Sequence, residues 1–386
     1  MALPRDVRAV FAAKTARTFG YGFLGVLLPV YLTDLGLGAT AIGAVVTLLL
    51  AGSAALTWAV RRPAELWGSR TTLLGLAVLS VLAAGLLVAT HEPWLVVLAA
   101  LLANVAVGTG ETGPFLTLDQ VLVARAVPAA RRTTILSWYN LLGYGAAAVG
   151  AATIRVVPAP RALFAVFLLV AVVQCAAYAA LGRGLAPARR PPGAPRPSAP
   201  LIRRLAALFA LDSFAGGFVL QALVAYFLHA RYGLGLEALG GVFFVVQLLT
   251  AVSLLLAARA ARRFGLLPTM VVSHLVSNAV LVAIAFAPTA AVAVGLLFVR
   301  HLLSQMDVPT RQAYVMAVVE DHEREAAATA TNLARTAAQA VTPALTGWVM
   351  QAVALSAPFA LGGGLKIVYD LLLYWTFKDV KLKRDA

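Results

Sequence analysis

The chain contains a single cysteine, Cys175, which excludes an internal disulfide and a thiolate metal site. Charged residues are also scarce: they make up 12% of the 386 residues, about half the usual share in soluble domains. Hydrophobic residues make up 61%. This excess is too large for one soluble core and is what helices facing lipid require. The sequence therefore predicts an all-α protein that crosses a membrane several times.

Sequence motifs of nucleotide-driven and hydrolytic proteins are absent. The chain has no Gly-x-x-x-x-Gly-Lys-Ser/Thr, no His-Glu-x-x-His and no Gly-x-Ser-x-Gly pattern. Its five histidines are scattered over loops and separate predicted helices, which gives no metal cluster. We therefore expect no enzyme activity, no cofactor and no direct use of ATP.

Twelve apolar segments are long enough to span a bilayer. In the first half they are 10–32, 40–60, 71–90, 94–118, 133–156 and 161–181. In the second half they are 205–229, 236–258, 267–287, 291–316, 327–350 and 357–377. The prolines and charges between the halves favour an extended linker. We therefore divide the chain into a bundle at 1–182, a basic linker at 183–204 and a bundle with a short tail at 205–386.

The net charge of +15 is distributed unevenly over this predicted topology. Most Lys and Arg fall in the linker, the tail and the loops that the topology places on one side of the membrane. Such an asymmetry marks the cytoplasmic side. We therefore expect both termini in the cytoplasm, the bacterial inner (cytoplasmic) membrane as location, lipid as surroundings and no nucleic-acid partner.

The two halves repeat each other. Four glycines recur 197 residues later: Gly20, Gly36, Gly43 and Gly68 match Gly217, Gly233, Gly240 and Gly265. Further along the offset is 192: Gln120, Val127, Arg132 and Asn140 match Gln312, Val319, Arg324 and Asn332. A constant offset over several landmarks indicates two six-helix repeats, an arrangement that places a substrate site near the membrane midplane.

Several motifs resemble the major facilitator superfamily over essentially the whole chain. Leu28–Leu37 resembles the outer end of the family's first helix, and Arg61–Arg70 resembles its cytoplasmic loop between helices 2 and 3. The loop is degraded, with Glu65 where an Asp is usual. Asn104 stands where proton-coupled members usually carry an Arg, and the Gly-Pro pair typical of drug antiporters is missing from the fifth span.

The resemblance implies the major facilitator fold, with twelve transmembrane helices in two pseudo-symmetric six-helix bundles that work by alternating access. It is nearest to bacterial drug-efflux-like members. We therefore expect a monomeric secondary transporter that exports a small organic or amphipathic compound as a proton antiporter. One alternative is an importer or facilitator of a small anionic metabolite. Another is a membrane sensor or scaffold that transports nothing.

Ionisable side chains inside the spans are the best functional candidates, because each is costly unless it is paired or hydrated. In the family, helices 1, 4, 7 and 10 line the cavity, and buried carboxyls there can exchange protons. The proton-coupling candidates are Glu111, Asp212 and Asp307. The alternative for Glu111 is a structural ion pair or a hydrogen bond between packed helices. For Asp307 it is a pair with Arg311, four residues on.

A second set of side chains suits substrate binding or charge relay: Arg17, Asn104, Arg300, His301, Gln305 and Arg335. Arg300 is always charged, so within a span it must face water, a substrate anion or an acid. Arg17 and Asp212 lie at comparable depths in the two repeats, and we expect them to face each other across the cavity. The alternative for Arg17 is snorkelling to the lipid headgroups.

The remaining candidates are gates or structural groups. The gate candidates are Asp34, Glu65, Arg70, Asp119, Arg131, Arg132 and Arg311, where Asp119 would form an inner salt bridge with the nearby arginines. Lys366 and Asp370 are one turn apart and are expected to form a structural ion pair. Asn140 and Asn332 are expected to form hydrogen bonds between helices.

Overall fold

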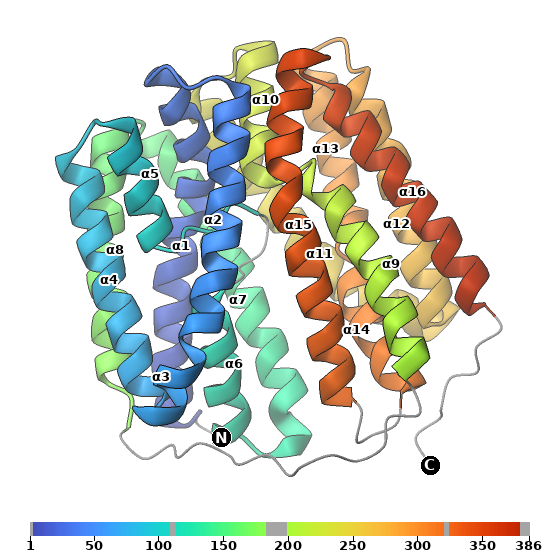
Figure 1. The fold of residues 1–386 in the computed structure, drawn as a ribbon, viewed down its shortest axis with the longest axis horizontal. Helices are drawn as coiled ribbons and strands as arrows, with labels where there is room; N and C mark the ends of the chain where they lie inside the picture. Colours follow the sequence, from blue (N-terminus) through green and yellow to red (C-terminus); the bar gives the residue numbers. More distant parts are fainter. Residues whose placement is uncertain (1–2, 109–112, 183–198, 320–323, 379–386) are drawn as a thin grey trace. The chain divides into compact units, whose positions relative to one another are not determined.

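The structure is a computed structural model of the chain, and it describes residues 3–108, 113–182, 199–319 and 324–378 (Figure 1). Within these ranges every regular element is an α-helix. Six helical stretches of the described residues are long and apolar enough to cross a membrane. Large apolar side chains face outward on many helices, among them Trp58, Trp94, Trp138, Phe286 and Trp375. Such exposure fits a lipid environment, where outward-facing helix surfaces need no polar groups.

The first repeat contains eight helices. They are α1 (Arg5–Asp34), α2 (Ala39–Ala59), α3 (Arg61–Leu66), α4 (Ser69–Ala89), α5 (Pro93–Leu102), α6 (Pro114–Ala126), α7 (Ala129–Val156) and α8 (Pro160–Ala179). The span expected at 94–118 is two helices, because α5 ends at Leu102 and α6 begins only at Pro114. Proline is favoured as the first residue of a helix, since the N–H that it lacks would have no partner there.

The second repeat also contains eight helices. They are α9 (Ala199–Gly217), α10 (Gln221–Tyr232), α11 (Leu236–Phe264), α12 (Leu266–Ala285), α13 (Ala290–Ser304), α14 (Asp307–Val318), α15 (Arg324–Ala352) and α16 (Ala357–Phe377). The spans expected at 205–229 and 291–316 are each broken into two helices. The linker expected at 183–204 ends earlier, because α9 already begins at Ala199.

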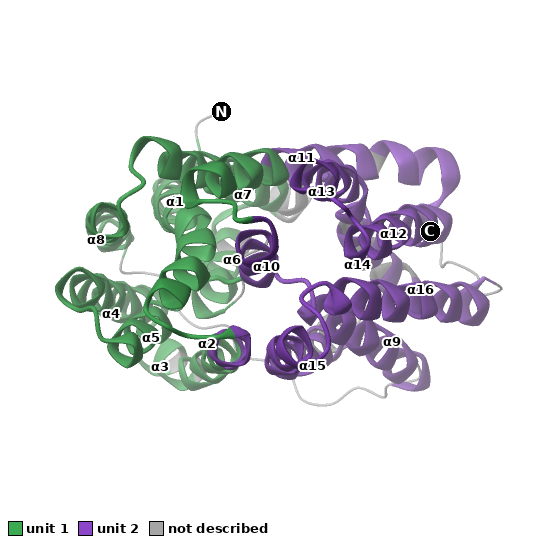
Figure 2. Ribbon diagram, turned by 90° about the horizontal axis from the view of Figure 1, so that it is seen from above, with its two compact units in different colours: residues 1–38, 48–190, 233–247 green, residues 39–47, 191–232, 248–386 purple. Residues whose placement is uncertain are grey.

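The chain forms two compact units, which do not coincide with the two repeats (Figure 2). Unit 1 comprises residues 1–38, 48–190 and 233–247, and unit 2 comprises residues 39–47, 191–232 and 248–386. Helices α2 and α11 are thus each divided between the units. The first residues of α2 belong to unit 2, which contains most of the second repeat. The first residues of α11 belong to unit 1, which contains most of the first repeat.

Close helix contacts hold each unit together. In unit 1, α1 packs against α7 and α8, and α4 packs against α8. A Cβ on Gly22 would overlap the backbone of Ala147, so α1 and α7 touch through their main chains. In unit 2, α9 packs against α15, and α12 packs against α13 and α16. There Gly43 and Gly347 bring α2 and α15 into a similar contact. Small residues at such crossings are typical of helices that associate in lipid.

The internal repeat is visible in the backbone. Gly36 and Gly233 both have positive φ angles, of 91° and 70°, at the turns that precede α2 and α11. Gly68 and Gly265 have φ angles of 84° and 88° at the turns that precede α4 and α12. Residues other than glycine rarely adopt this region. The matching glycines of the sequence therefore occupy matching turns.

Candidate transport site

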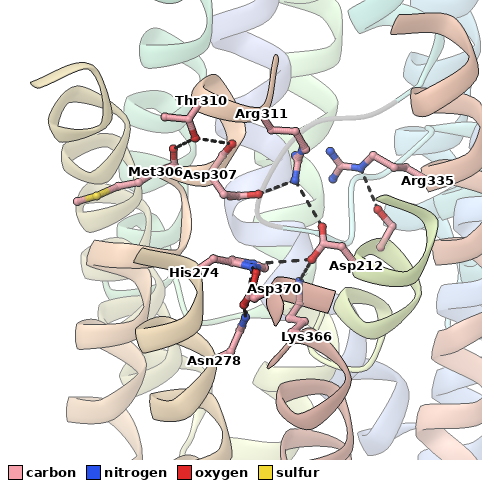
Figure 3. Close-up of polar contacts among 11 residues, drawn as sticks. Asp212, His274, Asn278, Met306, Asp307, Thr310, Arg311, Arg335, Lys366 and Asp370 are labelled. Carbon is pink, nitrogen blue, oxygen red and sulfur yellow. Dashed lines mark hydrogen bonds and ion pairs between the residues drawn. The ribbon is translucent and has the colours of Figure 1, made fainter. Parts of the chain in front are cut away.

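A chain of buried polar groups crosses unit 2, and Asp212 on α9 lies at its centre (Figure 3). Lys366 Nζ on α16 is 2.5 Å from Asp212 Oδ1, and Arg311 Nη1 on α14 is 3.4 Å from Asp212 Oδ2. His274 Nε2 on α12 is 3.7 Å from Asp212 Oδ1. These four side chains are all nearly inaccessible to solvent. One carboxylate therefore connects four helices.

Two further carboxylates extend this group. Arg311 Nη1 also binds Asp307 Oδ2, one turn away on α14, at 2.5 Å. Asp370 Oδ1 on α16 is 2.7 Å from His274 Nδ1, and Asn278 Nδ2 donates to Asp370 Oδ2 at 2.9 Å. Asp370 is therefore the carboxylate of this group that contacts no Lys or Arg among the described residues.

Arg335 on α15 lies beside this network but forms no ion pair with a carboxylate of the described residues. Its Nε donates to Ser213 Oγ on α9 at 2.9 Å, one residue from Asp212 (Figure 3). We refer to Asp212, His274, Asp307, Arg311, Lys366 and Asp370 as the unit 2 network.

The expected ion pair between Lys366 and Asp370 is replaced by two contacts to other helices. Lys366 binds Asp212, whereas Asp370 binds His274 and Asn278. A spacing of one turn predicts that two side chains are neighbours, but here each side chain contacts a residue on another helix. His274 and Asn278 were not among the predicted site residues. Their spacing of four residues, which places both on one face of a mostly apolar helix, was the available signal.

Arg300 and His301 stand at the end of α13, close to the break before α14. Arg300 Nη1 is 3.3 Å from His301 Nε2, and His301 Nδ1 is 3.4 Å from Thr250 Oγ1 on α11. Arg300 Nε is buried without a hydrogen-bond partner among the described residues. Within the described chain, no carboxylate lies within ion-pair distance of Arg300. Gln305 forms the C-cap of α13 at the break itself.

Unit 1 contains a separate buried ion pair. Arg17 Nη2 on α1 is 2.9 Å from Asp119 Oδ2 on α6, and the two residues are 1% and 0% exposed. Tyr139 on α7 donates its hydroxyl to Asp119 at 2.8 Å, and Arg17 donates to the hydroxyl of Tyr178 on α8 at 2.6 Å. The guanidinium of Arg17 also lies 4.7 Å above the ring of Phe115.

This geometry corrects two expectations about Arg17. Its guanidinium is buried among four helices rather than extended toward a headgroup layer. Its acidic partner is Asp119 of its own unit, and Asp212 likewise binds Lys366 and Arg311 of its own unit. The expected Arg17–Asp212 pair is thus replaced by one pair inside each unit. Asp119 forms a buried salt bridge with Arg17. The side chains of the arginines that follow it in the sequence lie outside the described residues.

Asn104 has an unusual backbone where α5 ends. Among the described residues other than glycine, Asn104 alone has a positive φ, of 52°. Its side chain is 5% exposed, and both amide atoms are buried without a partner in the described part of the chain. An unpaired buried amide next to a broken helix is a polar group available to a ligand.

The other candidates are distributed as follows. Asp34 is exposed at the end of α1, and Arg70 donates to the carbonyl of Ala179 at 3.0 Å. Glu111 and the side chains of Glu65, Arg131 and Arg132 lie outside the described residues. Asn140 and Asn332 are exposed on α7 and α15, and within the described part of the chain neither side chain makes the expected hydrogen bond to another helix.

Comparisons with known proteins agree with this architecture. An uncharacterized membrane protein of Saccharomyces cerevisiae, YJR124C, is 23% identical over 433 residues, covering 99% of this chain and 96% of the yeast protein. The D-xylose-proton symporter structure has a TM-score of 0.71 at 14% identity, covering 98% of both chains. The human organic anion transporter MFSD10 (TETRAN) has a TM-score of 0.67 at 16% identity, covering 96% of this chain and 99% of its own.

The structural matches establish the fold. The sequence pattern of the Major Facilitator Superfamily itself matches residues 10–306, which is more than half of the chain. These matches are to transporters and not to enzymes. The chain therefore belongs to the Major Facilitator Superfamily and is a multi-pass membrane transporter.

Proposed function

We propose that this transporter is driven by protons through the unit 2 network. The observation that carries the proposal is the continuous line of polar contacts from Asp370 through His274 to Asp212. From Asp212 the line continues through Arg311 to Asp307. It joins α9, α12, α14 and α16, so a change of charge at one member acts on four helices.

We propose His274 as the residue that takes up the proton. An imidazole can gain a proton on one ring nitrogen while the other nitrogen keeps its own. Its two nitrogens contact Asp370 and Asp212, at 2.7 and 3.7 Å. A proton gained there adds a cation beside Asp212 and competes with Lys366 and Arg311 for that carboxylate. The contacts of α9 to α14 and α16 then weaken, and the equilibrium between two arrangements of these helices shifts.

Fold similarity supports this choice of coupling ion. The D-xylose-proton symporter shares the fold over nearly the whole chain. We propose export of a small organic or amphipathic compound by a monomer that works by alternating access. The basic loops support cytoplasmic termini, and we propose the inner membrane as location. Glu111 remains a predicted second proton carrier.

A second candidate is uncoupled diffusion of a small anion. Two observations favour it. Asp212 and Asp307 already bind cations, and Arg300 binds no acid among the described residues. The human organic anion transporter with the same fold is a further point in its favour.

Proteoliposome transport with an imposed pH gradient distinguishes the two candidates. A panel of small organic solutes is offered with the gradient inward, outward or absent. Proton coupling predicts accumulation that follows the gradient and is lost in His274→Gln, whereas His229→Gln at the end of α10 behaves like the native protein. Equal flux under all three conditions contradicts coupling and leaves facilitated diffusion. No flux of any solute contradicts both.

A further inference from the structure

We propose that Arg300, His301, Thr250, Ser253 and Ser304 form a subsite that binds one carboxylate group of the transported compound. The inference rests on the proposed transport function and deepens it, since it names the chemical class of the substrate. All five residues belong to unit 2. They come from α11 and α13, which the contact between Thr250 and His301 joins at 3.4 Å.

His301 fixes the orientation of the Arg300 guanidinium. A guanidinium can only donate hydrogen bonds, so His301 Nε2 accepts the bond from Arg300 Nη1 at 3.3 Å. The imidazole therefore carries its proton on Nδ1, which donates to Thr250 Oγ1. This relay holds the guanidinium at Nη1 and leaves its Nε edge open for a ligand. Nε is buried and has no partner among the described residues. The Nε edge is the side on which a carboxylate binds with two parallel hydrogen bonds.

Two hydroxyl groups add further donors. Ser253 is 0% exposed and Ser304 is 6% exposed, and neither hydroxyl has a partner among the described residues. Ser253 lies three residues after Thr250 on α11, and Ser304 lies four residues after Arg300 on α13. Side chains at these spacings share one face of a helix. Buried hydroxyls without a partner are rare and call for a ligand or an ordered water.

The charge of the surrounding helices requires an anion. Among the described charged side chains of α9 and α11–α16 that are not exposed, Arg300, Arg311, Arg335 and Lys366 are cations, and Asp212, Asp307 and Asp370 are carboxylates. The carboxylates whose charge reaches Arg300 are Asp212 and Asp307. Both already bind Arg311, and Asp212 also binds Lys366. The cations therefore outnumber the carboxylates by one. Arg300 is the cation whose buried Nε has no partner among the described residues.

The donors suit a carboxylate better than a phosphate. One guanidinium edge matches the two oxygens and single charge of a carboxylate. A phosphate brings a third oxygen and up to two charges, which a second cation would have to balance. The second arginine that the sequence suggested for anion binding, Arg17, already holds Asp119. We therefore assign a monocarboxylate or one end of a longer carboxylate compound to this subsite.

Equilibrium binding to the purified protein in detergent tests the assignment without a membrane or a gradient. The probes are benzoate and hexanoate, each matched by its neutral amide, and inorganic phosphate. The proposal predicts that each carboxylate binds at least tenfold more tightly than its amide. Arg300→Gln should remove this preference, Arg300→Lys should restore part of it, and Arg231→Gln, on an exposed arginine of α10, should leave it intact.

A second variant guards against misfolding of Arg300→Gln. Ser304→Ala removes one hydroxyl without altering charge, and about threefold weaker carboxylate binding is expected at native thermal stability. The proposal is overturned if carboxylates bind no better than amides, if phosphate binds more tightly than either acid, or if Arg300→Gln and Ser304→Ala both bind the acids like the native protein. Failure of proton coupling in proteoliposomes leaves these binding results unchanged, so the two proposals fail separately.

Discussion

Asp119 and Arg311 occupy equivalent positions in the two repeats and carry opposite charges. They are separated by the same 192 residues that separate Gln120 from Gln312. Each binds the opposite charge on the first helix of its own repeat: Asp119 binds Arg17 on α1, and Arg311 binds Asp212 on α9. The buried ion pair is thus present in both repeats, and its polarity is inverted.

The ion pair in unit 1 predicts a large loss of stability when its acid is removed. Asp119→Asn removes the carboxylate that Arg17 binds at 2.9 Å, and breaking a buried ion pair from one side costs about 3–5 kcal/mol of the free energy of unfolding. Thermal unfolding in detergent measures the change. Asp34→Asn is the matched control, because Asp34 is exposed at the end of α1. Equal stability of the two variants would contradict the structural role of Asp119.

Removal of both partners should be milder than removal of one in unit 2. Asp212→Asn leaves Lys366 buried with no carboxylate at 2.5 Å, so we expect a fall in the unfolding temperature and loss of proton-driven flux. The double change Asp212→Asn with Lys366→Met should recover most of the stability and none of the proton-driven flux. A double variant as unstable as the single one would show that Lys366 is not the group that needs Asp212.

The close glycine contact between α1 and α7 predicts that the effect of a glycine-to-alanine change on stability depends strongly on its position. Gly22→Ala places a methyl group against the backbone of Ala147, and overpacking of this kind costs about 1–3 kcal/mol. Gly75→Ala on α4 meets nothing within 4 Å and should be neutral or slightly stabilising. The unfolding temperatures of the two variants in the same detergent compare these outcomes. A neutral Gly22→Ala would rule out the close contact.

Asn104 allows its backbone role to be separated from its side-chain role. Asn104→Gly keeps a residue that tolerates the φ of 52°, whereas Asn104→Ala should lose about 1 kcal/mol because alanine disfavours this region. Both variants lack the amide. If the amide binds the transported compound, the two variants slow transport to the same extent while they differ in unfolding temperature. Native transport in both would limit Asn104 to a turn residue.

The sequence predicts the helices well because hydropathy and length determine them directly. The expected span 10–32 lies within α1, and 357–377 coincides with α16. The breaks inside three expected spans were not predicted. Hydropathy stays high across Phe218–Leu220, where the backbone leaves the helical path between α9 and α10. A short break in a helix with apolar residues on both sides does not lower the mean hydropathy of the surrounding sequence window.

The partners of the buried charges were harder to predict. A helical spacing of four residues correctly paired Asp307 with Arg311, since that contact depends on one helix alone. Lys366 and Asp370 have the same spacing but bind residues on α9 and α12. The choice between a local and a distant partner depends on the rotation of each helix in the bundle. One sequence determines that rotation only loosely.

Proton movement driven by a solute gradient is the direct test of proton coupling through the unit 2 network. Proteoliposomes that contain a pH-sensitive dye are given an inward solute gradient and no imposed pH gradient. Proton coupling through the unit 2 network predicts a change of internal pH with the native protein. It predicts no change with Asp212→Asn plus Lys366→Met, although that variant is expected to bind the solute still. Solute flux through the native protein with no change of internal pH, or the same change with the double variant, would contradict it.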